Sequence, residues 1–460
     1  MNQNDLLSLV SSVNQNFIGP VLSVLLLGTG LYFTVRLGFI QRYFNDAIRI
    51  LFRRSGKNGK ASKEEGMSPF QALSTAIASQ VGTGNIVGVS TALIAGGPGA
   101  LFWLWMSAIV GMSTNFAEAV LGQLYKTQKE GHIVGGPAYY IRHGMNSKIL
   151  AGIFSVFFIL ALGMTGIMVQ ANSIVDAVSN IIPPAVDKLY IGIGLTVIVG
   201  LVLAGGITRI ASFAEKVVPL MASIFIFGSI IFICTRISVL PGILADIFHY
   251  AFSPKASVGG AMGITVMTTI RYGVSRGLFS NEAGLGSTPH AHAIAKVKNP
   301  YDQGLIALIG IGVDLLVCTL TALVILMSGV LETNPEAQGV RVPQLAFDST
   351  FGNAGNIFIA VALFFFALST IVGWYFFAAQ NVRYLFGEKG VWPYRILIMM
   401  LILLASMVHV NLIWELADTF NFFLVIPNVI ALIYLSPQVM KQCRMLKEEI
   451  KASKNEGKKE

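Results

Sequence analysis

The sequence predicts an all-α polytopic membrane protein with about eleven transmembrane helices, and two observations predict it. First, 54% of the 460 residues are hydrophobic and only 12% are charged, whereas soluble domains carry about 25% charged residues. Second, the apolar residues form continuous runs long enough to cross about 30 Å of hydrocarbon as helices, without the strict alternation of membrane β-strands. Together these observations exclude a soluble enzyme, a secreted disulfide-rich protein and a disordered chain.

Each apolar run predicts one helix. The first is an N-terminal helix at 17–37, and the runs that follow divide into two sets of five. The first set is predicted at 69–95, 98–123, 149–180, 188–206 and 209–235. The second set is predicted at 258–291, 301–331, 354–384, 394–411 and 412–437.

The basic residues of the connecting loops predict the orientation. Alternate loops hold 26 Lys and Arg residues, in the segments 36–68, 124–148, 206–217, 292–300, 383–395 and 440–460, while the other loops hold four. Loops rich in Lys and Arg stay in the cytoplasm. The N-terminus is therefore predicted outside and the C-terminus in the cytoplasm of a plasma-membrane protein. The formal charge of +9 is an orientation signal, and no nucleic-acid partner is expected.

The run at 69–95 is interrupted at its centre by Gly82, Thr83, Gly84 and Asn85. Glycine costs about 1 kcal/mol relative to alanine inside a helix. Unpaired main-chain groups in hydrocarbon cost several kcal/mol more unless they face a cavity or a ligand. Taken alone, this run allows two interpretations: close helix packing through small residues, or a break that presents amides and carbonyls to a ligand.

A second interruption favours the break. The segment 271–287 places two arginines, a glutamate and four glycines within apolar surroundings. The two interrupted runs open the two sets of five helices, and the sets must be inverted relative to each other because five is odd. Paired interruptions in inverted repeats indicate a substrate site near the bilayer midplane. The predicted organisation is an N-terminal helix and basic loop (1–68), a first repeat (69–257), an inverted second repeat (258–437) and a basic tail (438–460).

At these residues the chain resembles a known family. The stretches FQALSTAIASQVGTGNIVGV, GGPGALFWLW and SRGLFSNEAGLGS are similar to the sodium:alanine (alanine/glycine:cation) symporter family, and the likeness extends from the first run to the last. The resemblance implies a leucine-transporter-type fold of inverted five-helix repeats with one added N-terminal helix. It also implies symport of a small neutral amino acid, alanine or glycine, with Na⁺ as the coupling ion. No other cofactor, no enzymatic activity and no obligate protein partner are expected.

An amino-acid zwitterion needs donors for its carboxylate, acceptors for its ammonium group and a wall for its side chain. The half-helix that follows the first break suits the carboxylate, because a helix N-terminus carries free amides and a partial positive charge. The residues expected at the substrate site are Ser79, Gln80, Gly82, Thr83, Gly84, Asn85, Gln170, Phe279, Ser280, Asn281 and Trp374. The alternatives are an interhelical hydrogen bond for Gln170 and simple packing for Trp374.

The resemblance also implies a Na⁺ site. In the related fold, the third helix of the second repeat supplies hydroxyl groups to a Na⁺ held against the broken helix, and Ser369 and Thr370 occupy the matching place. The implied ligands are the carbonyls of Ala78, Val81 and Phe366 and the two hydroxyls, an all-oxygen shell that hard cations prefer. From the residues alone, hydroxyls that bond carbonyls of their own helix remain the alternative.

Two alternative functions stay open. Gln80 stands where the family usually has a smaller residue, which makes glutamine the alternative substrate. A proton-coupled amino-acid carrier would instead use a carboxylate inside the membrane, and Asp314, Glu282 and Glu118 are the candidates. Asp314 and Glu118 are also the expected ion-pair partners of Arg276, because an unpaired arginine is costly in the membrane.

Overall fold

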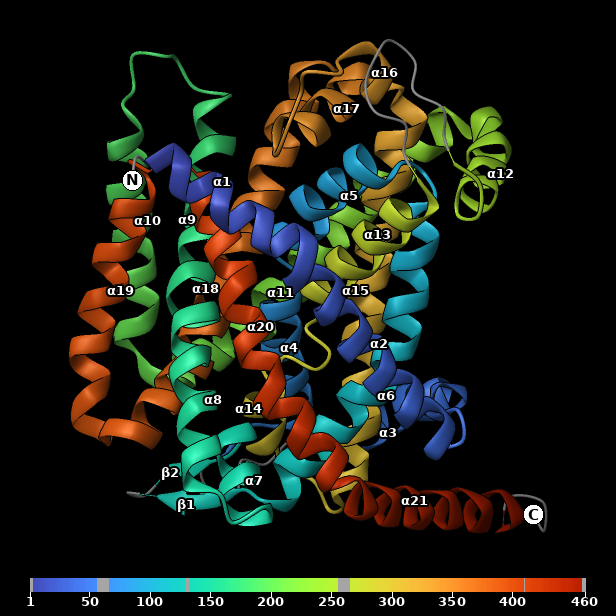
Figure 1. Ribbon diagram of the computed structural model, residues 1–460, viewed down its shortest axis with the longest axis vertical. Coiled ribbons are helices and arrows are strands. Elements are labelled where there is room, and N and C mark those ends of the chain that lie inside the picture. Colours follow the sequence, from blue (N-terminus) through green and yellow to red (C-terminus); the bar gives the residue numbers. More distant parts are fainter. Residues whose placement is uncertain (1–2, 56–65, 130–131, 255–264, 409, 457–460) are drawn as a thin grey trace.

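The computed structural model describes residues 3–55, 66–129, 132–254, 265–408 and 410–456. These residues form a bundle of helices with one antiparallel hairpin, β1 (Thr127–Lys129) and β2 (His132–Val134), at one end of the bundle (Figure 1). The first and last helices lie at opposite ends of the bundle, as an odd number of membrane crossings requires. The predicted all-α fold class is confirmed.

The N-terminal span is bent and tied to the rest of the bundle. α1 (Gln3–Val13) continues through the π-helical turn η1 (Asn14–Ile18) into α2 (Gly19–Arg36). Asn14 donates to the backbone carbonyl of Glu415 at 2.7 Å and to its carboxylate at 2.6 Å. This holds the bend against α20 (Val410–Tyr434). The 3-10 turn η2 (Ile40–Tyr43) and α3 (Phe44–Ser55) follow.

The first predicted repeat contains two half-helices and four longer helical segments. Its helices are α4 (Pro69–Gln80), η3 (Gly84–Gly88), α5 (Val89–Gly96), α6 (Ala100–Leu124), α7 (Pro137–Gly144), α8 (Lys148–Leu160), η4 (Ala161–Gly166), α9 (Ile167–Ser179), α10 (Lys188–Ala204), α11 (Gly206–Thr235), η5 (Ile237–Val239) and α12 (Leu240–Tyr250).

The second predicted repeat contains the matching elements, followed by a C-terminal helix. Its helices are α13 (Val266–Asn281), α14 (Pro289–Ala293), α15 (Pro300–Ser328), α16 (Val330–Thr333), α17 (Arg341–Phe351), α18 (Asn353–Phe386), η6 (Glu388–Gly390), α19 (Val391–Ala405), α20 and, beyond it, α21 (Ser436–Glu456).

Among the described residues, each predicted apolar run contains helix, but the helices are not equally able to cross a membrane by themselves. Seven spans in the described chain are long and apolar enough, and the bent pair α4 and α5 makes an eighth. α10 has 17 residues and α19 has 15, so both are short. α13 is also short, with 16 residues, and it carries Arg271 and Arg276.

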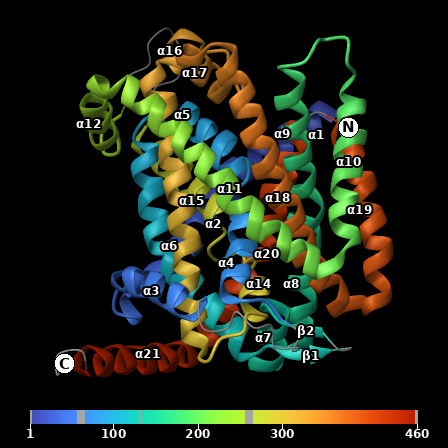
Figure 2. The ribbon, with the colours of Figure 1, turned by 180° about the vertical axis from the view of Figure 1, so that it is seen from behind.

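Equivalent helices of the two repeats pack against one another in pairs. α6 packs on α15, α9 on α18 and α10 on α19, as expected for two inverted copies related by a two-fold axis. Figures 1 and 2 show α8 to α10 with α18 and α19 on one side, and α6, α13 and α15 on the other. α4 lies between these two groups, so the first broken helix runs through the centre of the molecule.

The sequence explains where α4 begins and ends. Ser68 accepts from the amide of Gln71 at 3.1 Å, and the Gln71 side chain accepts from the amide of Ser68 at 3.0 Å, which is a capping box. Pro69 takes the first helical position, where no amide is needed. Val81 then turns extended, with φ −91° and ψ 90°. The chain resumes as helix at Gly84 with its axis bent by 48°, so the predicted first break is present.

The second break lies further along than the sequence indicated. α13 is continuous through Arg276 to Asn281, and the chain leaves the helix only at 282–288. Glu282 ends the helix in the left-handed conformation with φ 57°, and Gly284 and Gly286 follow with φ 93° and 74°. Gly273 and Gly277 lie inside α13 and do not break it. They allow close packing on α6 instead, since a Cβ at Gly273 would collide with the carbonyl of Ala100.

The contact between α6 and α15 depends on Gly304. A Cβ there would lie 2.7 Å from Cγ2 of Val120 and 2.9 Å from the ring of Phe116. Overpacking of this kind costs about 1–3 kcal/mol, so Gly304→Val should lower the melting temperature of the detergent-purified protein, followed by tryptophan fluorescence. Gly194→Val is the control, because a Cβ at Gly194 would have nothing within 4 Å. Equal melting temperatures for the two variants would contradict the close packing.

Candidate functional site

At the first break, side-chain oxygens cap two main-chain amides. The amide of Gly82 donates to Oδ1 of Asn85 at 2.9 Å, and the amide of Thr83 donates to Oε1 of Gln170 in α9 at 3.1 Å. Both amides stand at the N-terminal end of the half-helix made by η3 and α5, where the partial positive charge of a helix favours an anion. The end of this half-helix therefore presents donors to a negatively charged group.

On the other side of the break, carbonyl oxygens meet a hydroxyl. Oγ1 of Thr370 in α18 lies 3.0 Å from the carbonyl of Ala78 and 3.3 Å from that of Val81. The same hydroxyl lies 3.0 Å from the carbonyl of Phe366 in its own helix, to which Ser369 donates at 2.8 Å. All five predicted cation ligands thus lie together and are buried. The own-helix bonds foreseen as the alternative are also present, so the two interpretations are compatible.

Gly82 allows this approach. A Cβ at Gly82 would lie 2.5 Å from Oγ1 of Thr370 and 3.1 Å from Oε1 of Gln170. A residue with a side chain would therefore push α18 and α9 away from the break. The position requires glycine for close approach of neighbouring helices.

At the second break, the carboxylate of Glu282 collects hydrogen bonds from three directions. Nε1 of Trp374 in α18 donates to Oε1 at 2.6 Å, and the hydroxyl of Ser79 in α4 donates to Oε2 at 3.1 Å. The hydroxyl of Ser287, within the broken segment, also donates to Oε2. Glu282 therefore joins both breaks to α18. Trp374 does more than pack, because its indole nitrogen holds this carboxylate.

A second carboxylate links the breaks through α15. Oδ1 of Asp314 accepts from Nδ2 of Asn85 and from the hydroxyl of Ser280, each at 2.6 Å. Gln80 adds a direct link, since its Nε2 donates to the carbonyl of Asn281 at 2.8 Å. The two interrupted helices are thus connected by side chains that lie between them.

Among the described residues, three buried polar atoms of the predicted substrate-site residues have no hydrogen-bond partner. They are Oε1 of Gln80, Oγ1 of Thr83 and Nδ2 of Asn281, and each of these residues is at most 2% exposed. Buried polar atoms in folded proteins are almost always paired, with protein, water or ligand. Two acceptor-capable atoms and one donor therefore stand ready for a polar ligand at the breaks.

Three buried carboxylates in this region lack a basic partner. Glu118 in α6 accepts from the amide of Gly286 at 2.9 Å and from Nδ2 of Asn428 in α20 at 2.7 Å. Among the described residues, no ion pair includes Glu118, Glu282 or Asp314. Their charges are balanced by hydrogen-bond donors, by a proton or by a bound cation, because a bare charge is too costly at this depth.

A large cavity opens at the end of the bundle opposite the β-hairpin. Its volume is about 810 Å³, and its lining includes Thr91, Asn172, Asp176, Arg276, Arg341 and Glu415. Arg276 does not pair with Asp314 or Glu118, as the sequence analysis expected. Its Nη1 instead lies 3.7 Å from Oδ2 of Asp418, because the side chain leaves α13 toward α20, where it also covers the ring of Trp414 at 5.5 Å.

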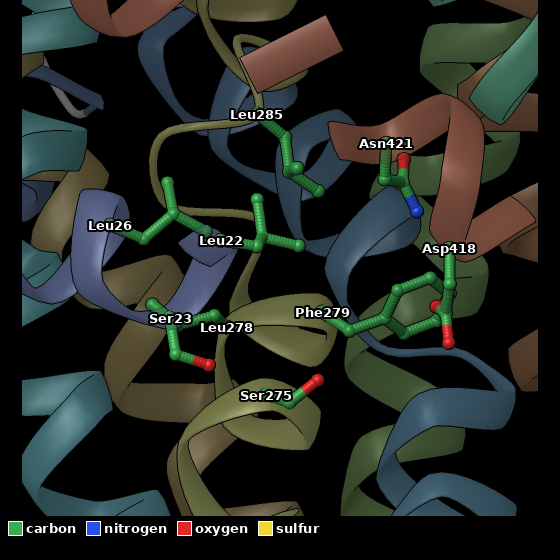
Figure 3. Close-up of a pocket in the computed structure, with 9 residues that line it drawn as sticks. All are labelled: Leu22, Ser23, Leu26, Ser275, Leu278, Phe279, Leu285, Asp418 and Asn421. Carbon is green, nitrogen blue, oxygen red and sulfur yellow. The ribbon is translucent and has the colours of Figure 1, made fainter. Parts of the chain in front are cut away.

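A small cavity of about 20 Å³ lies between α2, α13 and α20 (Figure 3). The side chain of Phe279 lines it, and the Phe279 ring centroid is 5.6 Å from that of Trp414. Phe279 is therefore turned toward α20, away from the polar groups of the first break. Both polar atoms of the Asn421 side chain line this cavity without a hydrogen-bond partner, and the volume is sufficient for one water molecule.

The structure brings most of the predicted residues together. Those that lie at or between the two breaks, or contact them from α9 and α18, are Ala78, Ser79, Gln80, Val81, Gly82, Thr83, Gly84, Asn85, Gln170, Ser280, Asn281, Phe366, Ser369, Thr370 and Trp374. Phe279 is the exception. In the sequence analysis Glu282 and Asp314 were considered only for ion pairs or proton transfer, and their role in linking the two breaks was missed. The signal that could have indicated this role is an acidic residue within an apolar run.

Comparisons with known proteins show the family of the chain. A family model described as the sodium:alanine symporter family matches residues 3–460. The chain belongs to this family. It is 38% identical over 464 residues to the sodium/alanine symporter AgcS of Methanococcus maripaludis, and 99% of each chain is covered. It is 37% identical over 451 residues to the probable sodium/glutamine symporter GlnT of Bacillus subtilis, with 97% of this chain and 92% of that relative covered.

A solved structure shares the fold. The crystal structure of the Eremococcus coleocola manganese transporter in complex with an aromatic bis-isothiourea substituted compound matches with a TM-score of 0.55 and 15% identity, covering 78% of this chain and 76% of that one. At this identity the likeness concerns the fold alone. Together with family membership, it confirms the predicted leucine-transporter-type class. The protein is a multi-pass membrane transporter of the sodium/amino-acid symport type, and not an enzyme.

Trp374→Phe tests the bond that holds Glu282. The substitution keeps an aromatic ring but removes the donor to a buried carboxylate, and hydrogen bonds to charged groups are worth about 1.5–3 kcal/mol. We expect a lower melting temperature and a slower uptake rate than in the unmodified protein. Trp392→Phe is the control, since that side chain is 68% exposed. A Trp374→Phe variant that melts and transports like Trp392→Phe would contradict the assignment.

Proposed function

We propose that this symporter carries alanine or glycine into the cell together with Na⁺, by alternating access. The observation that carries the proposal is the first break, where amides of one half-helix and carbonyls of the other lie within a few residues of each other. A zwitterion and a metal ion need these two kinds of main-chain group. The family and its sodium/alanine relative support the same substrate class.

The substrate carboxylate would bind at the start of the half-helix formed by η3 and α5. The amides of Gly82 and Thr83 now donate to the side chains of Asn85 and Gln170. An entering carboxylate would take over these donors, and the displaced side-chain amides could then donate their own N–H groups to it. Backbone amides at a helix N-terminus suit this role because they are fixed in direction and carry partial positive charge.

The ammonium group would use the acceptors left free between the breaks. Oγ1 of Thr83 is buried and has no hydrogen-bond partner among the described residues, and the carboxyl oxygens of Glu282 lie nearby, bound to Ser79 at the first break. The space for a substrate side chain is small, because Trp374 packs closely on the backbone of Gly166: a Cβ there would lie 2.7 Å from Cζ3 of the indole. A hydrogen or a methyl group fits such a wall better than a long amide chain.

The position of Gln80 also favours alanine over glutamine. Its side chain reaches from α4 toward α15 and α13, where its Nε2 is bound to the carbonyl of Asn281 and its Oε1 would lie 2.5 Å from a Cβ at Gly310. Gln80 therefore fills space between helices. It supplies no additional room for a longer substrate, so the departure that suggested glutamine is explained by helix packing.

Na⁺ would bind beside the substrate, against the carbonyls of Ala78 and Val81. Thr370 and Ser369 would supply hydroxyl oxygens, and the carbonyl of Phe366 would complete a shell of hard oxygen ligands. Val81 precedes the two capped amides directly, so a cation on its carbonyl and an anion on the following amides share one short segment. This proximity is the physical basis proposed for coupling, because each ligand fixes the segment that the other needs.

The basic loops and the large cavity support transport into the cell. The basic segments belong to the end of the bundle that carries α3, the β-hairpin and α21 (Figure 1), which we assign to the cytoplasm. The 810 Å³ cavity opens at the other end, and we therefore assign it to the outside. Entry of one Na⁺ at 100 mV then contributes about 2.3 kcal/mol to uptake.

Proton coupling is the second candidate, and one observation favours it. Glu118, Glu282 and Asp314 are buried without a basic partner in the described chain, and a buried carboxylate is the usual proton carrier in transporters. Na⁺ remains the preferred coupling ion, because the hydroxyl and carbonyl oxygens at the first break need no proton to act.

Thr370→Val tests the cation site. In proteoliposomes with an inward Na⁺ gradient, we expect the Na⁺ concentration for half-maximal alanine uptake to rise at least about tenfold, since one lost ligand is worth at least about 1.4 kcal/mol. Thr196→Val is the control, because the Thr196 hydroxyl bonds the Gly192 carbonyl in its own helix. Unchanged Na⁺ dependence in Thr370→Val would refute the site. Uptake that follows a pH gradient without Na⁺ would select the proton-coupled alternative.

Competition tests the substrate. Labelled alanine uptake by the unmodified protein is measured with increasing unlabelled alanine, glycine or glutamine. We expect alanine and glycine to compete at concentrations at least about tenfold lower than glutamine, because an extra buried amide without partners costs about 1–3 kcal/mol. Glutamine that competes as well as alanine would overturn the assignment and leave the sodium-coupled mechanism intact.

A further inference from the structure

The inner end of the N-terminal span has an unusual backbone. Directly after α2, Gly38 and Phe39 both adopt left-handed conformations, with φ 66° and 57°. Glycine tolerates this conformation, but phenylalanine does so only under strain. The result is that the Phe39 side chain stays 59% exposed, although an aromatic ring gains by burial. The turn therefore holds a large apolar group outward at the rim of the bundle.

Two cationic side chains meet at the same turn. Nζ of Lys447 in α21 donates to the carbonyl of Leu37 at 2.7 Å, and Nη2 of Arg42 donates to the carbonyl of Gly38. A Cβ at Gly38 would lie 3.1 Å from Lys447 Nζ and 3.6 Å from Arg42 Nη2. Arg42 and Lys447, some 400 residues apart in the sequence, thus place their charged groups beside Gly38.

These cations are only partly explained by the helix that they contact. The carbonyls at the end of α2 and in the turn attract positive charge, which accounts for the bond of Lys447 to Leu37 and for the bonds of Arg42 to Gly38 and Phe39. Among the described residues, no ion pair includes Arg42 or Lys447. Burial raises the pKa of the Cys443 thiol, and the positive charges of Lys447 and Arg42 lower it. Both positive charges therefore lie close to Cys443 in α21.

The acidic groups nearby are turned to other partners. The carboxylate of Glu449 accepts from the hydroxyl of Tyr301 and from Nδ2 of Asn299, and Asp46 in α3 pairs with Arg49 at 3.5 Å. Glu448 is exposed. The concentration of positive charge at Gly38 therefore remains uncompensated by a direct carboxylate contact.

The setting is a membrane surface. α21 lies across the end of the bundle, beyond α3 (Figures 1 and 2), and contacts the end of α2 through Lys447 and Leu37. One side of α21 is buried through Val439, Cys443 and Leu446, while Arg444, Lys447 and Lys451 follow one another at spacings that put them on one flank. The apolar side of α21 packs on the bundle, and its basic flank is of the kind that attracts the anionic surface of a membrane.

We propose that the turn at Gly38, with Arg42 and Lys447, binds the phosphate of an anionic phospholipid whose acyl chains contact Phe39. Arg42 has further N–H groups for a phosphate fork, and the ammonium of Lys447 has two more protons beyond its bond to Leu37. The exposed ring of Phe39 favours a lipid as the ligand, because a free anion has no acyl chain that could cover the ring. This site is independent of the substrate and cation sites.

The experiment uses the full-length protein in phosphatidylcholine vesicles that contain a trace of spin-labelled phosphatidylglycerol or spin-labelled phosphatidylcholine. The immobilised fraction of each label gives the selectivity for the anionic lipid. We expect a clear preference for phosphatidylglycerol, reduced about fivefold or more in the double variant R42Q/K447Q, since each basic residue at the surface contributes about a fivefold factor. The control R49Q/K441Q removes the same charge from α3 and α21, away from the turn at Gly38, and should keep most of the preference.

Three outcomes would overturn the proposal. They are an unmodified protein without preference, equal loss in R42Q/K447Q and R49Q/K441Q, and displacement of the labelled phosphatidylglycerol by inorganic phosphate at constant ionic strength, which would identify a site for free phosphate. Should the double variant fail to reconstitute, Phe39→Ser decides in its place. That variant keeps both charges, and we expect the immobilised phosphatidylglycerol fraction to fall, whereas an unchanged fraction would also overturn the proposal.

Discussion

The structure depends on one constraint: a main chain that leaves the helix deep inside a membrane protein must have every polar group accounted for. At Val81 to Thr83 this is achieved by neighbouring helices. Thr370 bonds the carbonyl of Val81, and Gln170 bonds the amide of Thr83. Because α18 and α9 thereby supply the partners that α4 lacks, the break determines how these three helices pack. For the same reason the break can bind a ligand, since a ligand can replace a side chain as the hydrogen-bond partner of a main-chain group.

Buried carboxyl groups are the second feature that organises the centre. Those of Glu282 and Asp314 each take hydrogen bonds from both interrupted helices or their neighbours, and Glu118 holds the amide of Gly286. Main-chain and side-chain donors fix the position of these groups, and no ion pair in the described chain includes them. The second broken segment therefore has a defined path even though 282–288 contains little regular structure.

Much of this arrangement could be predicted from the sequence, for reasons that particular residues make clear. The cluster from Gly82 to Asn85 sits in an otherwise apolar run, so the first break was visible. The second was placed too early, because Gly273 and Gly277 look like helix breakers in the sequence but serve close packing against α6. Contacts between distant residues, such as Trp374 with Glu282 or Arg276 with Asp418, could not be foreseen. They depend on which faces of two helices meet, and periodicity alone does not determine that.

The missing side chain at Gly82 has a consequence for ion discrimination. Because Gly82 has no Cβ, the hydroxyl of Thr370 in α18 can approach the C-terminal end of α4. A methyl group at position 82 would lie 2.5 Å from Oγ1 of Thr370. Oxygen cages distinguish metals by size and rigidity. At the proposed Na⁺ site, glycine at position 82 keeps the oxygen ligands close together, and an alanine there would be expected to widen the site and favour larger alkali ions.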